Sequence, residues 1–215
     1  MQEIDKIFFR KKVGPTLEAL KKKNFEPYFF ETSAEAKPFI LSQIKAGETV
    51  GIGGSATLRE NLQIVPEIRK QGNTVYDHWE AGTDRQRRIA LKRSHRGVDV
   101  FMSSTNAIAA DGTLVNLDGG GNRVASLCSG PKRVIVVAGV NKWVGSVEEG
   151  IHRTRNRAAV QRVLKGQIKT PCEATGVCSD CNAPRRICSA LLILMQKPHD
   201  IDQFTIILIN EELGF

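Results

Sequence analysis

Short apolar segments with the character of buried strands alternate along this chain with longer segments that have the character of helices. The expected strands span residues 25–31, 49–53, 73–77, 98–103, 132–139 and 204–210. Helices are expected at residues 4–23, 34–46 and 55–71, and within two basic segments. Continuous apolar strands joined by helical crossovers are typical of parallel sheets. The pattern therefore predicts an α/β fold, with a mainly parallel sheet that helices cover on both faces.

A turn-rich stretch at residues 105–125 departs from this alternation. Asp111 and Gly112 lie between apolar pairs, which is a strong signal for a β-hairpin. The chain has 215 residues, of which 41% are hydrophobic, the size and composition of one globular domain. We therefore expect residues 1–215 to form a single α/β domain, with a cysteine-rich, metal-binding loop at residues 170–190.

Several classes of protein are excluded by the apolar runs and the cysteines. The longest apolar runs, residues 134–140 and 187–195, are well short of the roughly 20 residues that a membrane span requires. The first ten residues lack the apolar core of a signal peptide. Five cysteines are too few for a disulfide scaffold, and in a reducing compartment clustered cysteines bind metal or carry out redox chemistry. These features predict a cytoplasmic protein without a membrane span.

The net charge of +8 is concentrated in two segments. Residues 85–96 and residues 151–169 each hold six basic residues and no acidic one. Of the chain's 31 basic residues, the other 19 stand against 23 acidic ones, which leaves a net charge of −4 outside these segments. Both are expected to be helices that bury one side, through Ile89 in the first and through Val160, Val163 and Leu164 in the second.

Two interpretations of these basic helices remain open. They bind an anion, or they are solvated faces or faces that dock a partner subunit, such as a second copy of the chain in a homo-oligomer. Aromatic residues make up 6% of the chain and none lies in either segment, so the stacking platform that single-stranded nucleic acid needs is missing. A small anionic ligand is therefore favoured over a nucleic acid.

A glycine turn at residues 51–57 joins an expected strand to an expected helix. Free N–H groups at a helix N-terminus carry partial positive charge, and glycines let an anion approach them closely. Gly53, Gly54, Ser55 and Thr57 are thus candidate ligands of a phosphate or carboxylate, and Thr57 and Glu60 also fit a capping box. The alternative is a tight turn without a ligand, since neither a complete dinucleotide fingerprint nor a Walker lysine is present.

A second polar constellation follows the next strands. Ligands of parallel sheets bind at the carboxyl ends of the strands, and a loop rich in glycine and amides there predicts a polar ligand site. Its alternative is a hairpin with ordinary turn chemistry. The candidate residues are Asn106, Asp118, Gly120, Gly121, Asn122, Arg123 and Asn141.

Four of the five cysteines fall within seventeen consecutive positions: Cys172, Cys178, Cys181 and Cys188. Four thiolates suit a [4Fe–4S] cluster or tetrahedral zinc. Zinc sites usually show two close cysteine pairs, whereas this segment has one, so the cluster is favoured over zinc. A redox dithiol formed by Cys178 and Cys181 alone is the remaining alternative. Cys128 stands apart and is expected to be a buried small apolar residue.

Three stretches together resemble the LUD-domain family, in the short form of its lactate-utilisation protein C or YkgG-like group: residues 106–125 (NAIAADGTLVNLDGGGNRVA), 130–142 (GPKRVIVVAGVNK) and 170–189 (TPCEATGVCSDCNAPRRICS), with a closing LGF. The resemblance implies a fold similar to the NagB/RpiA/CoA transferase superfamily, with the ligand site at the carboxyl ends of the strands. It also implies a link to the oxidation of lactate, with iron–sulfur partner proteins.

Three functions are compatible with these observations. The first is an oxidoreductase component with one [4Fe–4S] cluster, acting on a small carboxylate such as lactate. The second is a transferase or hydrolase for an anionic acyl or phospho substrate, in which the cluster is structural or a Lewis acid. The third is a non-catalytic, zinc-stabilised assembly module. Neither the substrate nor a catalytic residue follows from the sequence.

Overall fold

The main sheet of the computed structural model, which describes residues 1–215, has six parallel strands. Their order across the sheet is β1-β10-β7-β4-β2-β3. The strands are β1 (Glu26–Phe30), β2 (Thr49–Ile52), β3 (Thr74–Asp77), β4 (Val100–Ser103), β7 (Arg133–Gly139) and β10 (Gln203–Ile209). Each overlaps a strand expected from the sequence, and the predicted α/β fold with a mainly parallel sheet is confirmed.

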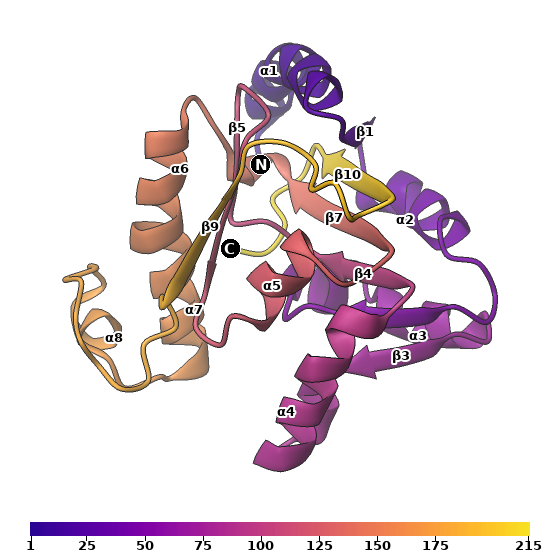
Figure 1. Ribbon diagram of the computed structural model, residues 1–215. Helices are drawn as coiled ribbons and strands as arrows, with labels where there is room; N and C mark the ends of the chain where they lie inside the picture. The colour runs from indigo at the N-terminus through magenta and orange to yellow at the C-terminus, as the bar shows by residue number, and fades with distance from the viewer.

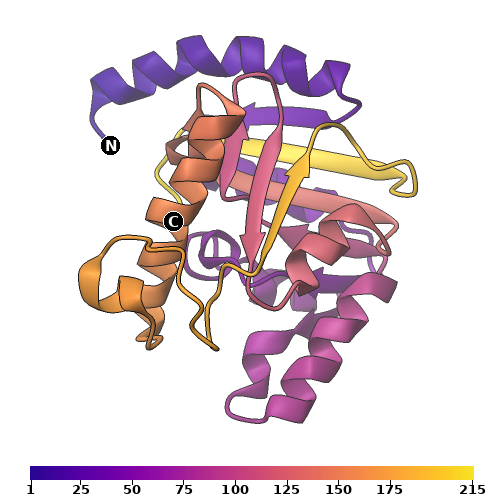
Figure 2. The same ribbon diagram turned by 60° about the vertical axis from the view of Figure 1, so that its left-hand side comes forward.

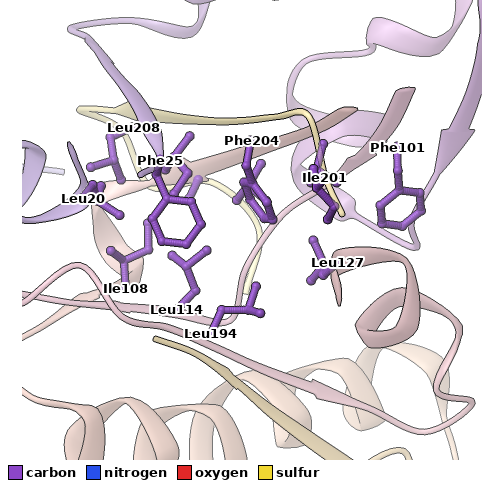
Figure 3. Close-up of a cluster of buried hydrophobic side chains, with 14 of the residues drawn as sticks. Leu20, Phe25, Phe101, Ile108, Leu114, Leu127, Leu194, Ile201, Phe204 and Leu208 are labelled. Carbon is purple, nitrogen blue, oxygen red and sulfur yellow. The ribbon is translucent and has the colours of Figure 1, made fainter. Parts of the chain in front are cut away.

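Alternate side chains of the central strands pack into separate cores on the two faces of the sheet, because successive side chains of a strand point to opposite sides. On one face, Phe204 of β10 packs in a cluster with Leu20 of helix α1 (Glu3–Lys22), as Figure 3 shows. On the other face, Ile207 of the same strand packs with Ile40 of α2 (Ser33–Ser42) and Ile68 of α3 (Ile64–Lys70).

A second, four-stranded sheet completes the cover of the first face, where helices alone were expected. Its order is β8-β5-β6-β9, with β5 (Ala107–Ala109), β6 (Leu114–Asp118), β8 (Trp143–Val144) and β9 (Ala190–Leu194). The predicted hairpin joins β5 to β6, and Gly112 in its turn has a φ of 82°. Strand β9 was not predicted; it follows the cysteine segment and pairs antiparallel with β6.

The helix expected at residues 55–71 is interrupted. A π-helical turn, η1 (Thr57–Asn61), precedes α3, and Gln63 between them is left-handed with a φ of 46°. The predicted capping box of Thr57 and Glu60 is wrong, because the capping side chain lies two residues earlier: Ser55 Oγ accepts a hydrogen bond from Leu58 N at 3.3 Å. The chain therefore enters η1 directly after the glycine turn.

The first basic segment forms helix α4 (Arg85–Ser94), but the expected buried side is wrong: no residue of α4 is buried, and Ile89 is 37% exposed. Figure 1 shows the reason, since α4 extends away from the sheet instead of lying across it. The short 3-10 helices η2 (His78–Ala81) and η3 (His95–Gly97) flank it.

The second basic segment forms a continuous helical stretch of α6 (Val147–Arg153), η5 (Thr154–Ala158) and α7 (Ala159–Gly166). Val160 and Val163 are buried as expected, whereas Leu164 is exposed. A short helix, α8 (Pro171–Thr175), follows and packs against α7 (Figure 2). None of the helices in the fold combines the length and the apolar character that a membrane span needs.

Candidate anion-binding cleft and cysteine segment

A cleft of about 530 Å³ opens at the carboxyl ends of strands β2, β3, β4 and β7. This is the edge at which parallel sheets bind ligands, because the loops that leave neighbouring strands converge there. The main wall segments are residues 54–57, 78–79, 103–106, 117–120, 186–187 and 214–215, together with Lys142. Parts of the chain that are distant in sequence therefore share one cavity.

Most residues of the two predicted ligand constellations lie in the walls of this cleft. They are Gly54, Ser55, Thr57, Asn106, Asp118, Gly120, Asn122 and Arg123. Gly53, Gly121 and Asn141 do not line it. A Cβ on Gly53 would lie 2.8 Å from Ser103 Oγ, so the glycine lets β2 end close to β4. Asn141 Oδ1 accepts a hydrogen bond from Leu213 N at 3.1 Å and fixes the chain after β10.

Arg123 holds the cleft wall together through its own hydrogen bonds. Its guanidinium donates to Asn116 Oδ1 at 2.8 Å, to Asn106 Oδ1 at 2.7 Å and to the backbone oxygens of Ser104 and Leu117. These partners occupy both terminal nitrogens with protein oxygens. Arg123 therefore positions the loops around the cleft and leaves ligand binding to other cations.

Asp118 is an ionised cap of the glycine loop, residues 119–121. Its carboxylate accepts hydrogen bonds from Gly120 N at 2.9 Å and from Arg123 N at 2.8 Å. Burial opposes ionisation, but the charge of Arg123 and these backbone donors outweigh it, so the pKa of Asp118 lies below its ordinary value. The carboxylate shapes the start of helix α5 (Asn122–Cys128), which begins directly after the loop.

Lys142 is the site residue that the sequence did not reveal. It follows β7 in the short 3-10 helix η4 (Val140–Lys142) and is 3% exposed. Its Nζ donates to Ser104 Oγ at 2.6 Å and to Thr57 Oγ1 at 3.2 Å, and no carboxylate forms an ion pair with it. Burial, together with the charges of Arg153 and Arg123, lowers the pKa of Lys142 to about 7. The one available signal was a lone lysine directly after a buried strand.

Both basic segments reach the cleft. Arg88 and Lys92 of α4 and Arg162 of α7 line it, and Asp118 is the one acidic residue in its walls. The glycine loop lies against α4, because a Cβ on Gly120 would be 3.4 Å from Lys92 Nζ. The guanidinium of Arg162 lies 5.3 Å from the ring centre of Trp79 at the same wall. With Asp118 capped by the backbone, the cavity has a net positive lining that suits an anion.

Two buried histidines beside the cleft stay neutral. His78 lines the cavity and its ring centre lies 5.5 Å from that of His95. Burial lowers the pKa of His78 to about 3 and that of His95 to about 4. His95 Nε2 lies 3.1 Å from the backbone oxygen of Tyr76, so this nitrogen carries the proton. Neither histidine adds charge to the lining at neutral pH.

The four clustered cysteines are half-buried and free of disulfides. Cys172 lies in α8, and the other three lie in the irregular chain between α8 and β9. The structure brings no three metal-ligating side chains together there or elsewhere. Arginines contact two of the sulfurs: Arg155 Nη2 lies 3.9 Å from Cys178 Sγ, and Arg186 Nε lies 3.3 Å from Cys188 Sγ. Each of these two thiols therefore has a guanidinium group beside it.

The cysteine segment packs directly on the glycine loop. A Cβ on Gly119 would lie 2.7 Å from Ile187 Cα, so only glycine allows this approach. Ser189 N also donates to the backbone oxygen of Asp118 at 3.1 Å. Because of this contact, Arg186 and Ile187 form part of the cleft wall. Cys128 lies in α5, away from this segment, and packs against the first core.

One solved structure shares the overall fold of this chain. A DUF162 family protein from Deinococcus radiodurans, known from a crystal structure, superposes with a TM-score of 0.53 at 11% identity, over 93% of this chain and 97% of that one. The eIF2B beta subunit from Chaetomium thermophilum matches over 53% of this chain and 43% of that one, with a TM-score of 0.31 and 14% identity. No curated protein sequence matches this chain. The model of the LUD domain family matches residues 15–209, and this chain therefore belongs to the LUD domain family.

Proposed function

We propose that this chain is an iron–sulfur oxidoreductase component that binds a small carboxylate, such as lactate, in the basic cleft. The observation that carries the proposal is the shared wall: Arg186 and Ile187, which lie between Cys181 and Cys188, also line the cleft. A cluster on these cysteines would therefore stand close to a bound substrate. The family's link to lactate utilisation agrees with a carboxylate ligand.

The donor set of the cysteine segment fits a [4Fe–4S] cluster. It offers four thiols: three lie in the irregular chain of residues 176–189, and the fourth, that of Cys172, lies in the short helix α8 directly before it. Arg155 and Arg186 place guanidinium groups next to two of the sulfurs, which offsets the negative charge of a thiolate-bound cluster. When bound, such a cluster supplies one-electron transfer.

The chain's own residues would bind and orient the carboxylate. Lys92 and Arg162 are cations of the cleft wall whose side chains have neither a carboxylate partner nor a hydrogen bond within the protein. They approach the cavity from two separate helices, α4 and α7. Arg123 and Asp118 keep the intervening glycine loop in place. A small anion held between these elements would lie within reach of the cysteine segment.

The cluster is tested by metal analysis of protein purified without oxygen. We expect iron and sulfide in the protein, with broad absorption near ~400 nm from thiolate–iron charge transfer. Cys181→Ser should abolish both, whereas Cys128→Ser, a matched change on α5, should retain them. Colourless protein with stoichiometric zinc would overturn the proposal and favour a zinc-stabilised assembly module. An iron cluster that cannot be reduced or oxidised would favour the transferase or hydrolase alternative.

The substrate site is tested by calorimetric titration with lactate. Lys92→Glu should abolish binding, because it reverses a charge in the cleft wall. Arg93→Glu is the matched control, since Arg93 is exposed on the same helix and does not line the cleft. Equal affinity in both variants would contradict a carboxylate site in this cavity.

A further inference from the structure

Lys142 is a buried amine without a carboxylate partner at the base of the cleft. Its Nζ has two partners, the hydroxyls of Ser104 and Thr57, and both of these residues line the cavity. A buried lysine that serves only structure is usually paired with an acid, because an unpaired buried charge is costly. No acidic side chain lies beside Lys142. Burial of this amine therefore costs stability, and the amine has no stabilising role in the fold.

The surroundings of Lys142 favour its neutral, nucleophilic form. The charged groups that act on it are Arg153 of α6 and Arg123 of α5, both cations, and its own burial acts in the same direction. These effects bring its pKa to about 7. A large fraction of the amine is therefore unprotonated at neutral pH, the condition under which lysines attack carbonyl groups.

We infer that Lys142 forms an imine with the carbonyl group of a small 2-oxo acid bound in this cleft. The inference rests on the proposed function, which accounts for the carboxylate group of this ligand. The carbonyl group of the ligand is inferred from the nucleophilic amine. The negative charge of the ligand is inferred from the cleft lining, in which Asp118 is the one acidic residue.

The reaction balances without an added oxidant or reductant. The lone pair of Lys142 Nζ attacks the carbonyl carbon, and the carbonyl π electrons move onto the oxygen, which takes a proton. The nitrogen of this adduct loses one proton to give the neutral carbinolamine. The hydroxyl of the carbinolamine takes up a second proton and leaves as water while the nitrogen lone pair forms the C=N bond, and the nitrogen then loses its remaining proton. The products are the imine and one water molecule, and hydrolysis reverses the step.

The two hydroxyls hold the amine in position for this attack. Ser104 Oγ accepts from Nζ at 2.6 Å and Thr57 Oγ1 accepts at 3.2 Å, so the end of a flexible side chain is fixed from the loop after β4 and from η1. The adjacent backbone is also close, since a Cβ on Gly214 would lie 3.4 Å from Nζ. Such fixation reduces the entropy that the lysine loses when it reacts.

The test is reductive trapping of the imine with pyruvate and cyanoborohydride, followed by peptide mapping. We expect one adduct, on the peptide that contains Lys142, formed faster as the pH rises from about 6 to 8 through the pKa of about 7. Lys142→Met should lose the adduct and keep its circular dichroism spectrum. Lys11→Met, an exposed lysine on α1, is the matched control and should label like the wild type.

Two further measurements separate the imine from the proposed function. Calorimetric binding of pyruvate and lactate without reductant, but no adduct on Lys142, would overturn the imine alone. Absence of binding together with absence of the adduct would overturn both. Acetone, an uncharged ketone, should label at least tenfold more slowly than pyruvate. Equal labelling by acetone, or adducts spread over exposed lysines, would refute a 2-oxo acid site.

Discussion

Lys142 and Ser104 are joined by a hydrogen bond of 2.6 Å between Nζ and Oγ, although 38 positions separate them in the sequence. The bond links the loop after β7 to the loop after β4, so it crosses the floor of the cleft between neighbouring strands. It holds a buried amine where an apolar side chain would pack at a lower cost in free energy. This contact gives a prediction for stability that is independent of any reaction.

Lys142→Met should stabilise the fold at neutral pH. The unfolded lysine binds its proton below about 10.5, whereas the folded lysine binds it only below about 7. Between these values the unfolded state holds more protons, so the free energy of unfolding of the wild type falls as the pH is lowered from 10.5 to 7. The gain should therefore be on the order of a few kcal/mol near pH 7.

Urea unfolding across this pH range measures that gain. It should shrink as the pH rises toward 10.5, because the wild-type lysine is then neutral in both states. Lys11→Met provides the baseline for removing a lysine without burial. A gain that does not change with pH would show that Lys142 is not held as a neutral amine.

Phe204 should be a major contributor to the stability of the first core. Its ring lies edge-on to that of Phe25 with 5.0 Å between the ring centres, and both side chains are buried (Figure 3). Truncation to alanine leaves a cavity that the parallel strands cannot close, so Phe204→Ala should lower the free energy of unfolding by about 3–5 kcal/mol. Phe8→Ala, which removes a half-exposed ring from α1, should change it by less than ~1 kcal/mol. Chemical denaturation of the two variants gives the comparison.

The main sheet could be predicted because its signals are local. Apolar runs such as residues 132–139 are long enough to identify a strand that is buried on both faces. Strand β9 lies in an apolar run too, residues 187–195, but that run continues directly from the cysteine segment, and its pairing partner, β6, lies more than seventy positions earlier. The side chains of Leu191 and Ile193 remain partly exposed, so even the burial pattern is weak.

The site could be predicted only in part for a related reason. The ends of the expected strands mark the sheet edge, and this located Ser55 and Asn106 in the cleft walls. The sequence cannot show which polar side chains are consumed by the fold, as Arg123 is by its four acceptor atoms. It also cannot show that a lone lysine is buried. Lys142 is enclosed by Thr57 and Ser104, which lie 85 and 38 positions earlier in the chain.

Stability should also fall in mild acid because of His95. The unfolded histidine takes up a proton near pH 6.5, but the folded one does so only near pH 4, since burial disfavours its charged form. The unfolded state therefore binds more protons between these values, and the free energy of unfolding decreases as the pH falls from 6.5 to 4. His78, shifted to about 3, acts in the same direction.

Replacing the ring identifies the source of this pH dependence. His95→Phe keeps an aromatic side chain against Phe101. It should reduce the slope of the free energy of unfolding against pH by the contribution of about one bound proton. His199→Gln, a change at an exposed histidine, should leave the slope as in the wild type. An unchanged slope in His95→Phe would contradict the low pKa of His95.

Gly119 should control the position of the cysteine segment. A methyl group at this position would lie 2.7 Å from Ile187 Cα, a separation that real side chains do not tolerate, so the segment must move away from the glycine loop. We expect Gly119→Ala to speed alkylation of Cys188 several-fold in metal-free protein, because Cys188 follows Ile187 directly. Gly120→Ala is the matched control, since its methyl group would meet only the ends of the Asn122 and Lys92 side chains. Thiol-labelling rates, read by mass spectrometry of the peptide that contains Cys188, decide the matter. Equal rates in the two variants would mean that the segment is held by β9 pairing alone and not by its contact with Gly119.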